Sequence, residues 1–229
     1  MIDSPAPPKT VYLAGPEVFM PAYADVVARK IALCRQYGFE PLSPSDDQVN
    51  QRKGLLQGPN PNPPHPETVS LISIIIYEAN VARMRACDFG ICDLTPFRGP
   101  SADIGTVFEL GLMTGMGKPV FGYSNVVSQY LDRISLRQLT DLHGRPNPLP
   151  TPIWNDENGW VIENFGNADN LMVDSALAVG AGAMVRRDVA LTERFTDLGA
   201  FEACLQQAQQ HFGMAVGATP PAAPTKTGS

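Results

Sequence analysis

A single carboxylate stands in an otherwise apolar stretch of this chain. Between Ile104 and Met116, Glu109 is the only charged side chain, and its neighbours are apolar or small. Removing a carboxylate from water is costly, so such a glutamate requires a partner, a shifted pKa or a chemical role. A carboxylate in this setting can act as a nucleophile, which makes Glu109 the first candidate catalytic residue. It could instead be a helix residue paired with a lysine or arginine elsewhere.

The segments around Glu109 follow the order in which α/β enzymes often build a site. A buried strand is predicted for residues 89–93, a loop rich in glycine and proline for residues 95–103, and a helix for residues 103–115. Ligands of open α/β sheets bind outside the carboxyl ends of the strands, where such loops lie. We therefore expect Glu109 to face a pocket at that edge of the sheet.

Apolar runs and helical spacing predict further elements. Strands are expected at residues 10–14, 39–42, 118–123 and, as a short piece, 160–163, and helices at residues 23–37, 68–87, 170–179 and 198–212. Strands that alternate with helices predict a parallel sheet with helices on both faces. Residues 43–66 are polar and rich in proline, which indicates a long loop that could be a lid or a subunit contact.

Composition limits the class of protein. The chain has 229 residues, 44% of them hydrophobic, which suits one domain at residues 10–214 between mobile tails at 1–9 and 215–229. A net charge of -6 and a pI near 5.0 argue against a nucleic-acid-binding surface. No apolar run is long enough for a membrane span, and no signal-peptide pattern is present. The four cysteines form no C-x-x-C pair, which favours reduced thiols in a cytoplasmic protein, and the three histidines lack metal-binding spacing.

Three segments occur in the order and on the element pattern of a known enzyme family. Residues 12–19 read Tyr-Leu-Ala-Gly-Pro-Glu-Val-Phe, residues 103–111 read Asp-Ile-Gly-Thr-Val-Phe-Glu-Leu-Gly, and residues 169–172 read Asp-Asn-Leu-Met. Together they resemble the opening loop, the nucleophile segment and the N-L-M segment of the nucleoside 2-deoxyribosyltransferase family, over about residues 10–177. The resemblance implies a flavodoxin-like, doubly wound, five-stranded parallel sheet with helices on both faces.

The resemblance also implies an activity. Enzymes of this family exchange the base of a 2′-deoxynucleoside in two steps: a glutamate attacks the anomeric carbon, and a second base then attacks the glycosyl-enzyme, so the configuration is retained. Glu109 matches the nucleophile, Tyr12 matches the tyrosine that orients it, and Asp103 matches the carboxylate that accepts a hydrogen bond from the sugar 5′-hydroxyl. On a simpler interpretation Asp103 is a helix N-cap and Tyr12 a core residue. No metal or organic cofactor is implied.

Further substrate contacts follow from the same resemblance. Gly15 and Phe19, in the first loop, are expected to bind substrate. Asn170 and Met172 match positions that reach into a neighbouring subunit's site, where the former would bind the 5′-hydroxyl and the latter would wall the pocket. The resemblance therefore implies a homo-oligomer with shared active sites. On a simpler interpretation Asn170 is a helix cap and Met172 a core residue.

One residue departs from the family pattern. The family usually carries an aspartate, which binds the base and is proposed to handle its proton, about eight residues before the aspartate that opens the third strand. Counting back from Asp88, this chain has Asn80. An amide can donate and accept hydrogen bonds but cannot act as a general acid. Either the base is protonated through water or another group, or the base preference is altered. Glu78 is a poor substitute, since two residues along a helix turn it about 200° away.

Three hypotheses follow. The leading one is a transferase that exchanges the bases of 2′-deoxyribonucleosides through a covalent Glu109 intermediate. The second is an N-glycosidase that hydrolyses 2′-deoxynucleosides or their 5′-monophosphates, although Glu17 in the first loop would repel a phosphate. The third is a non-catalytic nucleotide-sensing domain, because fold does not fix function. The sequence leaves open the purine or pyrimidine preference, the balance of transfer and hydrolysis, and the oligomer size.

Overall fold

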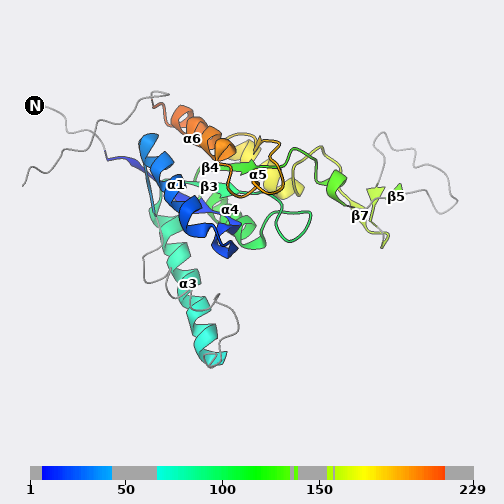
Figure 1. The fold of residues 1–229 in the computed structure, drawn as a ribbon, viewed down its shortest axis with the longest axis horizontal. Helices are drawn as coiled ribbons and strands as arrows, with labels where there is room; N and C mark the ends of the chain where they lie inside the picture. Colours follow the sequence, from blue (N-terminus) through cyan, green and yellow to red (C-terminus); the bar gives the residue numbers. More distant parts are fainter. Residues whose placement is uncertain (1–6, 43–65, 135–136, 139–153, 157, 215–229) are drawn as a thin grey trace, which may run out of the picture.

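A five-stranded parallel sheet forms the centre of the molecule in the computed structural model, which describes residues 7–42, 66–134, 137–138, 154–156 and 158–214 (Figure 1). The strand order is β2-β1-β3-β4-β8. Their bounds are β1 (Lys9–Ala14), β2 (Phe39–Pro41), β3 (Phe89–Asp93), β4 (Val120–Ser124) and β8 (Val185–Arg186). The chain reverses its direction of winding between β1 and β3, which is where sheets of this kind bind ligands. The predicted flavodoxin-like fold is confirmed.

Helices cover both faces of the sheet because successive side chains of each strand point to opposite sides. Val11 of β1 packs in a core cluster with α1 (Tyr23–Gln36) and α6 (Gly199–His211). Its neighbour Tyr12 packs in a second cluster with α3 (Pro66–Ala86), α4 (Ile104–Gly115) and α5 (Leu171–Gly180). The fully buried strands β3 and β4 lie between these two clusters, as expected for a parallel sheet. The catalytic candidates Tyr12 and Glu109 are therefore on the same face.

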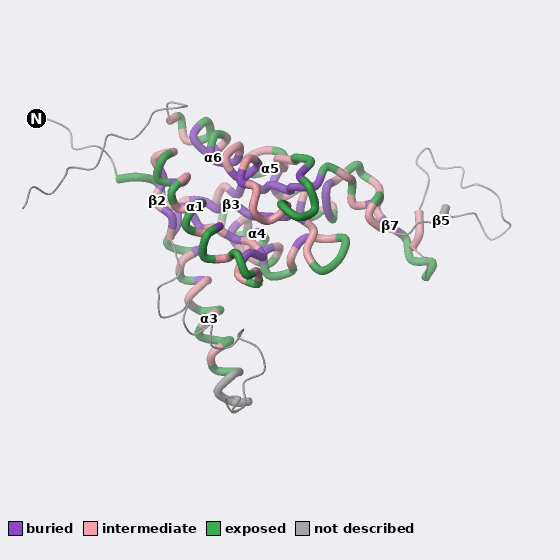
Figure 2. Tube along the Cα trace, viewed as in Figure 1, coloured by how far each residue is buried: buried purple, intermediate pink, exposed green. Residues whose placement is uncertain are grey.

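The first half of α3 projects away from the rest of the molecule (Figure 1). Figure 2 shows buried residues gathered around the sheet, whereas residues 70–80 of α3 include none. Several large apolar side chains of this segment are exposed, among them Leu71, Ile74 and Tyr77. Only the last part of the helix, with Val81 and Met84, packs in the core beside the sheet.

Most of the predicted elements are present with small shifts at their ends. The sequence did not identify β8, or the small antiparallel sheet of β5 (Arg137–Gln138), β6 (Trp154–Asn155) and β7 (Val161–Ile162), of which it predicted only the last strand. These strands have two residues each, too few to show a period of two. The predicted tails lie largely outside the described residues, as does the predicted loop up to residue 65, and α3 begins at Pro66. No helix in the described parts of the chain is both long and apolar enough to span a membrane.

Candidate active site

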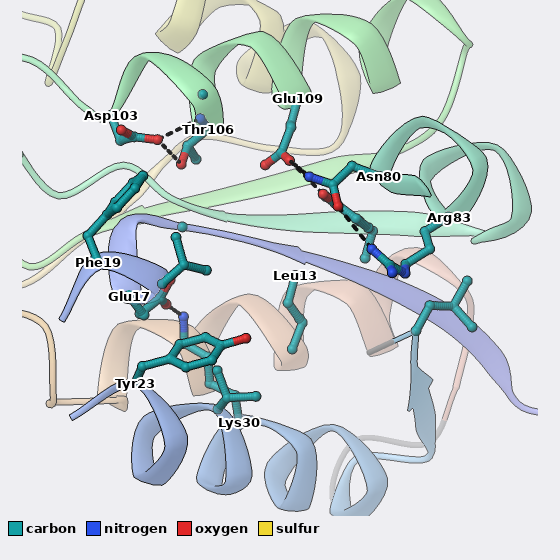
Figure 3. Close-up of a pocket in the computed structure, with 16 residues that line it drawn as sticks. Leu13, Glu17, Phe19, Tyr23, Lys30, Asn80, Arg83, Asp103, Thr106 and Glu109 are labelled. Carbon is teal, nitrogen blue, oxygen red and sulfur yellow. Dashed lines mark hydrogen bonds and ion pairs between the residues drawn. The ribbon is translucent and has the colours of Figure 1, made fainter. Parts of the chain in front are cut away.

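A pocket of about 210 Å³ opens at the carboxyl end of β1 (Figure 3). Its walls come from β1, the following 3₁₀ turn η1 (Pro16–Phe19), α1, the end of α3 and the start of α4. The pocket brings together six of the eight residues that the sequence predicted for the site: Tyr12, Gly15, Phe19, Asn80, Asp103 and Glu109. Segments that are far apart in the sequence thus meet at the edge of the sheet where a site was expected.

Glu109 lies within α4 and is held by side chains from two other elements. The Tyr12 hydroxyl donates a 2.6 Å hydrogen bond to Glu109 Oε1, and the Asn80 side-chain amide donates to the same oxygen over 3.4 Å. The first is short, as expected for an O–H group bonded to a carboxylate. Both contacts act on a half-buried group at the pocket wall. They fix the direction of the carboxylate.

Tyr12 is suited to this role because it keeps its proton. Its side chain is only 5% exposed, and burial together with the neighbouring Glu109 carboxylate raises the pKa of the phenol far above its usual value. A phenol that stays protonated donates a hydrogen bond to the ionised carboxylate and so favours the charged form. Tyr12 is thus both a core residue and the donor to Glu109.

Asp103 combines the two positions that the sequence suggested for it. It is the N-cap of α4, where its Oδ2 atom accepts hydrogen bonds from the Thr106 backbone N–H at 3.0 Å and from the Thr106 hydroxyl at 3.1 Å. The same half-buried residue also lines the pocket. The N-cap interpretation is correct, and it places the carboxylate at the pocket wall in a defined orientation.

Arg83 is a pocket residue that the sequence analysis missed. Its guanidinium donates a 2.9 Å hydrogen bond to Asn80 Oδ1, from one turn further along α3. Because a guanidinium can only donate, the amide oxygen of Asn80 faces Arg83 and the amide nitrogen faces Glu109. The sequence signal that could have identified Arg83 is its spacing of three residues from Asn80, which puts both side chains on one face of a helix.

A second carboxylate of the pocket, Glu17, is part of a buried ion pair. Glu17 and Lys30 contact each other directly and are both almost fully buried. A Cβ atom at Gly15 would overlap the Glu17 carboxylate, so a larger residue there would require Glu17 to move. Burial lowers the pKa of Lys30, and the negative charge of Asp93 opposes that shift. Since Lys30 offsets the charge of Glu17, the argument that Glu17 would repel a phosphate loses force.

Asn170 and Met172 lie outside this pocket. Asn170 is the N-cap of α5 and accepts a 3.0 Å hydrogen bond from the Met172 backbone N–H, so the helix-cap interpretation is correct. The Met172 side chain is 71% exposed, so its interpretation as a core residue is wrong. The expectation that both residues act in a neighbouring subunit stays a prediction.

The described residues provide neither a metal site nor a reactive thiol. In the described parts of the chain, no three His, Cys, Asp or Glu side chains are placed so that they could hold a metal ion. All four cysteines are buried and free of disulfides. Burial raises the pKa of Cys34 to about 12 and also raises those of Cys87, Cys92 and Cys204, so these thiols stay protonated.

Known proteins share this fold and these motifs. Residues 11–172 match the model of a family described as nucleoside 2-deoxyribosyltransferase. An uncharacterized protein of Schizosaccharomyces pombe is 30% identical over 190 residues, 81% of this chain and 84% of that protein. The solved structure of a 2-desoxiribosyltransferase from Leishmania mexicana gives a TM-score of 0.51 at 26% identity, covering 83% of this chain and 97% of that chain. A 2-deoxyribosyltransferase from Bacillus psychrosaccharolyticus covers 50% of this chain and 72% of its own at 24% identity, with a TM-score of 0.34 that supports no argument.

The family match contains each part of the pocket. It begins in β1 just before Tyr12, includes the end of α3 that carries Asn80 and the whole of α4 with Glu109, and reaches the start of α5. The Leishmania mexicana enzyme has the same fold over most of both chains. The chain therefore belongs to the nucleoside 2-deoxyribosyltransferase family, as its three sequence motifs predicted, and is an enzyme of the deoxyribosyltransferase type.

Proposed function

We propose that this protein transfers the 2-deoxyribosyl group of a 2′-deoxyribonucleoside from one nucleobase to another, through a covalent intermediate on Glu109. The observation that carries the proposal is the 2.6 Å hydrogen bond from the Tyr12 hydroxyl to a carboxylate that faces the pocket. A carboxylate that is oriented by a neutral donor retains its charge and can attack an anomeric carbon.

Along one wall of the pocket, Asp103 lies on one side of Glu109 and Asn80 on the other (Figure 3). A deoxynucleoside that places its 5′-hydroxyl against Asp103 presents its anomeric carbon to Glu109 and its base to Asn80. Glu109 attacks this carbon and displaces the first base. The second base enters the same position and attacks the glycosyl-enzyme, so two inversions give retention.

The preference for deoxy substrates has a steric origin in this arrangement. Glu109 and the Tyr12 hydroxyl lie together at the sugar position, 2.6 Å apart. A 2′-hydroxyl would compete for the same space, and Tyr12, buried in the core, has little room to move. This explanation is tested by comparing a 2′-deoxynucleoside with the ribonucleoside of the same base. We expect the ribonucleoside to react much more slowly.

A second chain is proposed to complete each site. Asn170 and Met172 are exposed at the start of α5, away from their own pocket, and several apolar side chains of α3 are exposed as well. Large exposed apolar patches are typical of subunit contacts. Co-expression of Glu109→Ala and Asn170→Ala chains tests the sharing of sites, because random dimers would then regain about a quarter of the wild-type activity. No regained activity would mean that each pocket works alone.

The proposed activity is tested by a base-exchange assay without phosphate. Purified protein is mixed with 2′-deoxyinosine or thymidine and excess adenine, and the products are separated by chromatography. We expect new 2′-deoxyadenosine, which the Glu109→Ala variant does not form. Release of free base without a new nucleoside, from a deoxynucleoside or its 5′-monophosphate, would indicate a hydrolase instead. Binding without turnover of any of these compounds would indicate a sensing domain.

A further inference from the structure

We infer that Arg83 is a catalytic residue that stabilises the departing nucleobase as an anion. The inference rests on the proposed transferase activity, because it assigns the leaving-group step of that reaction. It concerns a residue that none of the three sequence motifs contains.

The position of Arg83 is the first argument. It is half-buried, lines the pocket, and is anchored by its 2.9 Å hydrogen bond to Asn80 Oδ1 (Figure 3). A guanidinium has five N–H donors in a planar fork, so it can bond to more than one group at the same time. Arg83 therefore brings a fixed positive charge to the wall of the pocket beside Asn80.

The polarity of the pocket is the second argument. In Figure 3, Asp103 lies on one side of Glu109, and Asn80 and Arg83 lie on the other. When the sugar 5′-hydroxyl is bound at Asp103, the base extends toward the Asn80 and Arg83 side. Purine and pyrimidine bases carry ring-nitrogen and carbonyl acceptors, which match the donors of an amide and a guanidinium.

The third argument is the nature of the acids along the described pocket wall. Asn80 cannot release a proton. Tyr12 is a poor acid, since burial and Glu109 raise its pKa far above the usual value. Glu17 is paired with Lys30, and Asp103 caps α4 at the sugar end. At the base end, Asn80 and Arg83 therefore offer hydrogen-bond donors and positive charge to the base.

The step itself balances without a protein acid. The Glu109 carboxylate forms a bond to C1′, the bond from C1′ to the base nitrogen breaks, and its electron pair stays on the base. The guanidinium of Arg83 binds this anion through N–H donors and keeps its own protons, and the base then takes a proton from water. In the second half, the incoming base loses its N–H proton to water and attacks C1′, and the electron pair of the ester bond returns to Glu109. Such fixed charges act where charge develops in the transition state.

The experiment measures base release from a series of 2′-deoxynucleosides whose free bases differ in N–H acidity. The enzymes compared are the full-length wild type, Arg83→Met and Arg83→Lys, and Arg85→Met is the matched control because this exposed arginine lies on the same helix. For the least acidic bases we expect Arg83→Met to lower kcat about 100-fold, the loss typical of removing one such donor. For the most acidic bases the loss shrinks to less than about tenfold, because those anions need less stabilisation. Arg83→Lys falls between, since it keeps the charge and loses the planar fork.

The outcomes separate the inference from the proposed function. A uniform loss across all bases overturns the inference, because it means that Arg83 only positions Asn80. Unchanged rates in Arg83→Met overturn it as well, and urea unfolding of each variant shows that the fold is intact. No turnover by the wild type overturns the inference together with the transferase proposal. If the wild type transfers bases and Arg83→Met lowers kcat equally for every base, the proposed function holds and the inference about Arg83 is wrong.

Discussion

Glu109 and Glu17 line the same pocket, but they differ in their exposure and in the contacts that the structure gives them. Glu109 is half-buried and accepts hydrogen bonds from the Tyr12 phenol and the Asn80 amide. Glu17 is almost fully buried and forms an ion pair with Lys30, whose ammonium also lies over the rings of Tyr123 and Phe201. The two carboxylates are therefore fixed by different means within one site.

This difference points to a structural role for Glu17 and a chemical role for Glu109. A buried carboxylate that faces a lysine has its charge offset, and breaking the pair leaves an uncompensated charge in the interior. A carboxylate that is oriented by a protonated phenol keeps its charge and can attack an electrophile. The Glu17 ion pair holds the loop after β1 against α1, where the loop forms one wall of the pocket. We infer that Glu17 shapes the pocket and that Glu109 reacts in it.

The largest effect is expected from Glu109→Ala. Removal of a nucleophile should lower base exchange by about 1,000-fold or more, since no covalent intermediate can form. The free energy of unfolding should change by less than about 1 kcal/mol, because Glu109 is half-buried at the pocket wall. Chromatographic rates and urea unfolding measure both quantities. Exchange above a few per cent of wild type would contradict the assignment, and Glu109→Gln is the control that preserves side-chain size.

Among single substitutions in the Glu17–Lys30 ion pair, Lys30→Met is expected to lower stability the most. It leaves the Glu17 carboxylate buried without its cation, which should cost about 3–5 kcal/mol in the free energy of unfolding. The double variant Glu17→Gln/Lys30→Met removes both charges and should recover most of this loss. Urea unfolding of the single and double variants gives the comparison. Equal stability of the single variant and the wild type would show that the pair does not support the loop.

Tyr12→Phe should slow base exchange by about 10- to 100-fold, because a hydrogen bond to a charged group contributes about 1.5–3 kcal/mol. The chain offers a matched control in Tyr37→Phe. The Tyr37 hydroxyl donates a 2.7 Å hydrogen bond to the Glu202 carboxylate, a similar pair outside the pocket. We expect exchange rates of the control to stay at the wild-type level. Equal loss in both variants would point to a general effect of removing a phenol–carboxylate bond.

Sequence patterns alone predicted much of this arrangement. Glu109 was recognisable because it interrupts an apolar run, and the alternation of strands and helices placed it at the edge of the sheet where the strands end. Tyr12 and Asp103 followed from the resemblance of their segments to the family motifs. The N-cap role of Asp103 was predictable as well, since it directly precedes a helix.

The missed features depend on distant contacts or on short elements. Lys30 lies in an otherwise ordinary amphipathic helix, and its burial follows from the ion pair with Glu17 in another segment. Arg83 shares a helix face with Asn80, but the end of α3 becomes a pocket wall only when the helix packs beside β1. The two-residue strand β8 is recognisable only through its pairing with β4. Tertiary packing, which no local pattern encodes, decides all three.

The smallest expected effect concerns how the free energy of unfolding changes at alkaline pH. The change has opposite signs for the Tyr12–Glu109 pair and for the Glu17–Lys30 pair. Burial and Glu109 raise the pKa of Tyr12 above 10.0, its usual value, so the folded protein holds a proton that the unfolded chain releases. The stability from this group is fully present below pH 10 and is lost as the pH rises further. Burial lowers the pKa of Lys30 below 10.5, so the unfolded chain holds the extra proton and this contribution to stability rises with pH up to that value.

Free energies of unfolding measured between about pH 8 and pH 11 test these signs. Each proton that the folded and unfolded states hold differently changes the free energy of unfolding by at most about 1.4 kcal/mol per pH unit. The wild type should begin to lose stability above about pH 9, where the unfolded chain gives up its thiol protons, and should lose more above about pH 10, where it also gives up the Tyr12 proton. Tyr12→Phe should lose less, since one of these protons is removed. Glu17→Gln/Lys30→Met should lose more between about pH 9 and pH 10, because the rising contribution of Lys30 is gone. If the free energy of unfolding changes with pH by the same amount in all three proteins, the Tyr12–Glu109 pair and the Glu17–Lys30 pair do not differ in how they hold their protons.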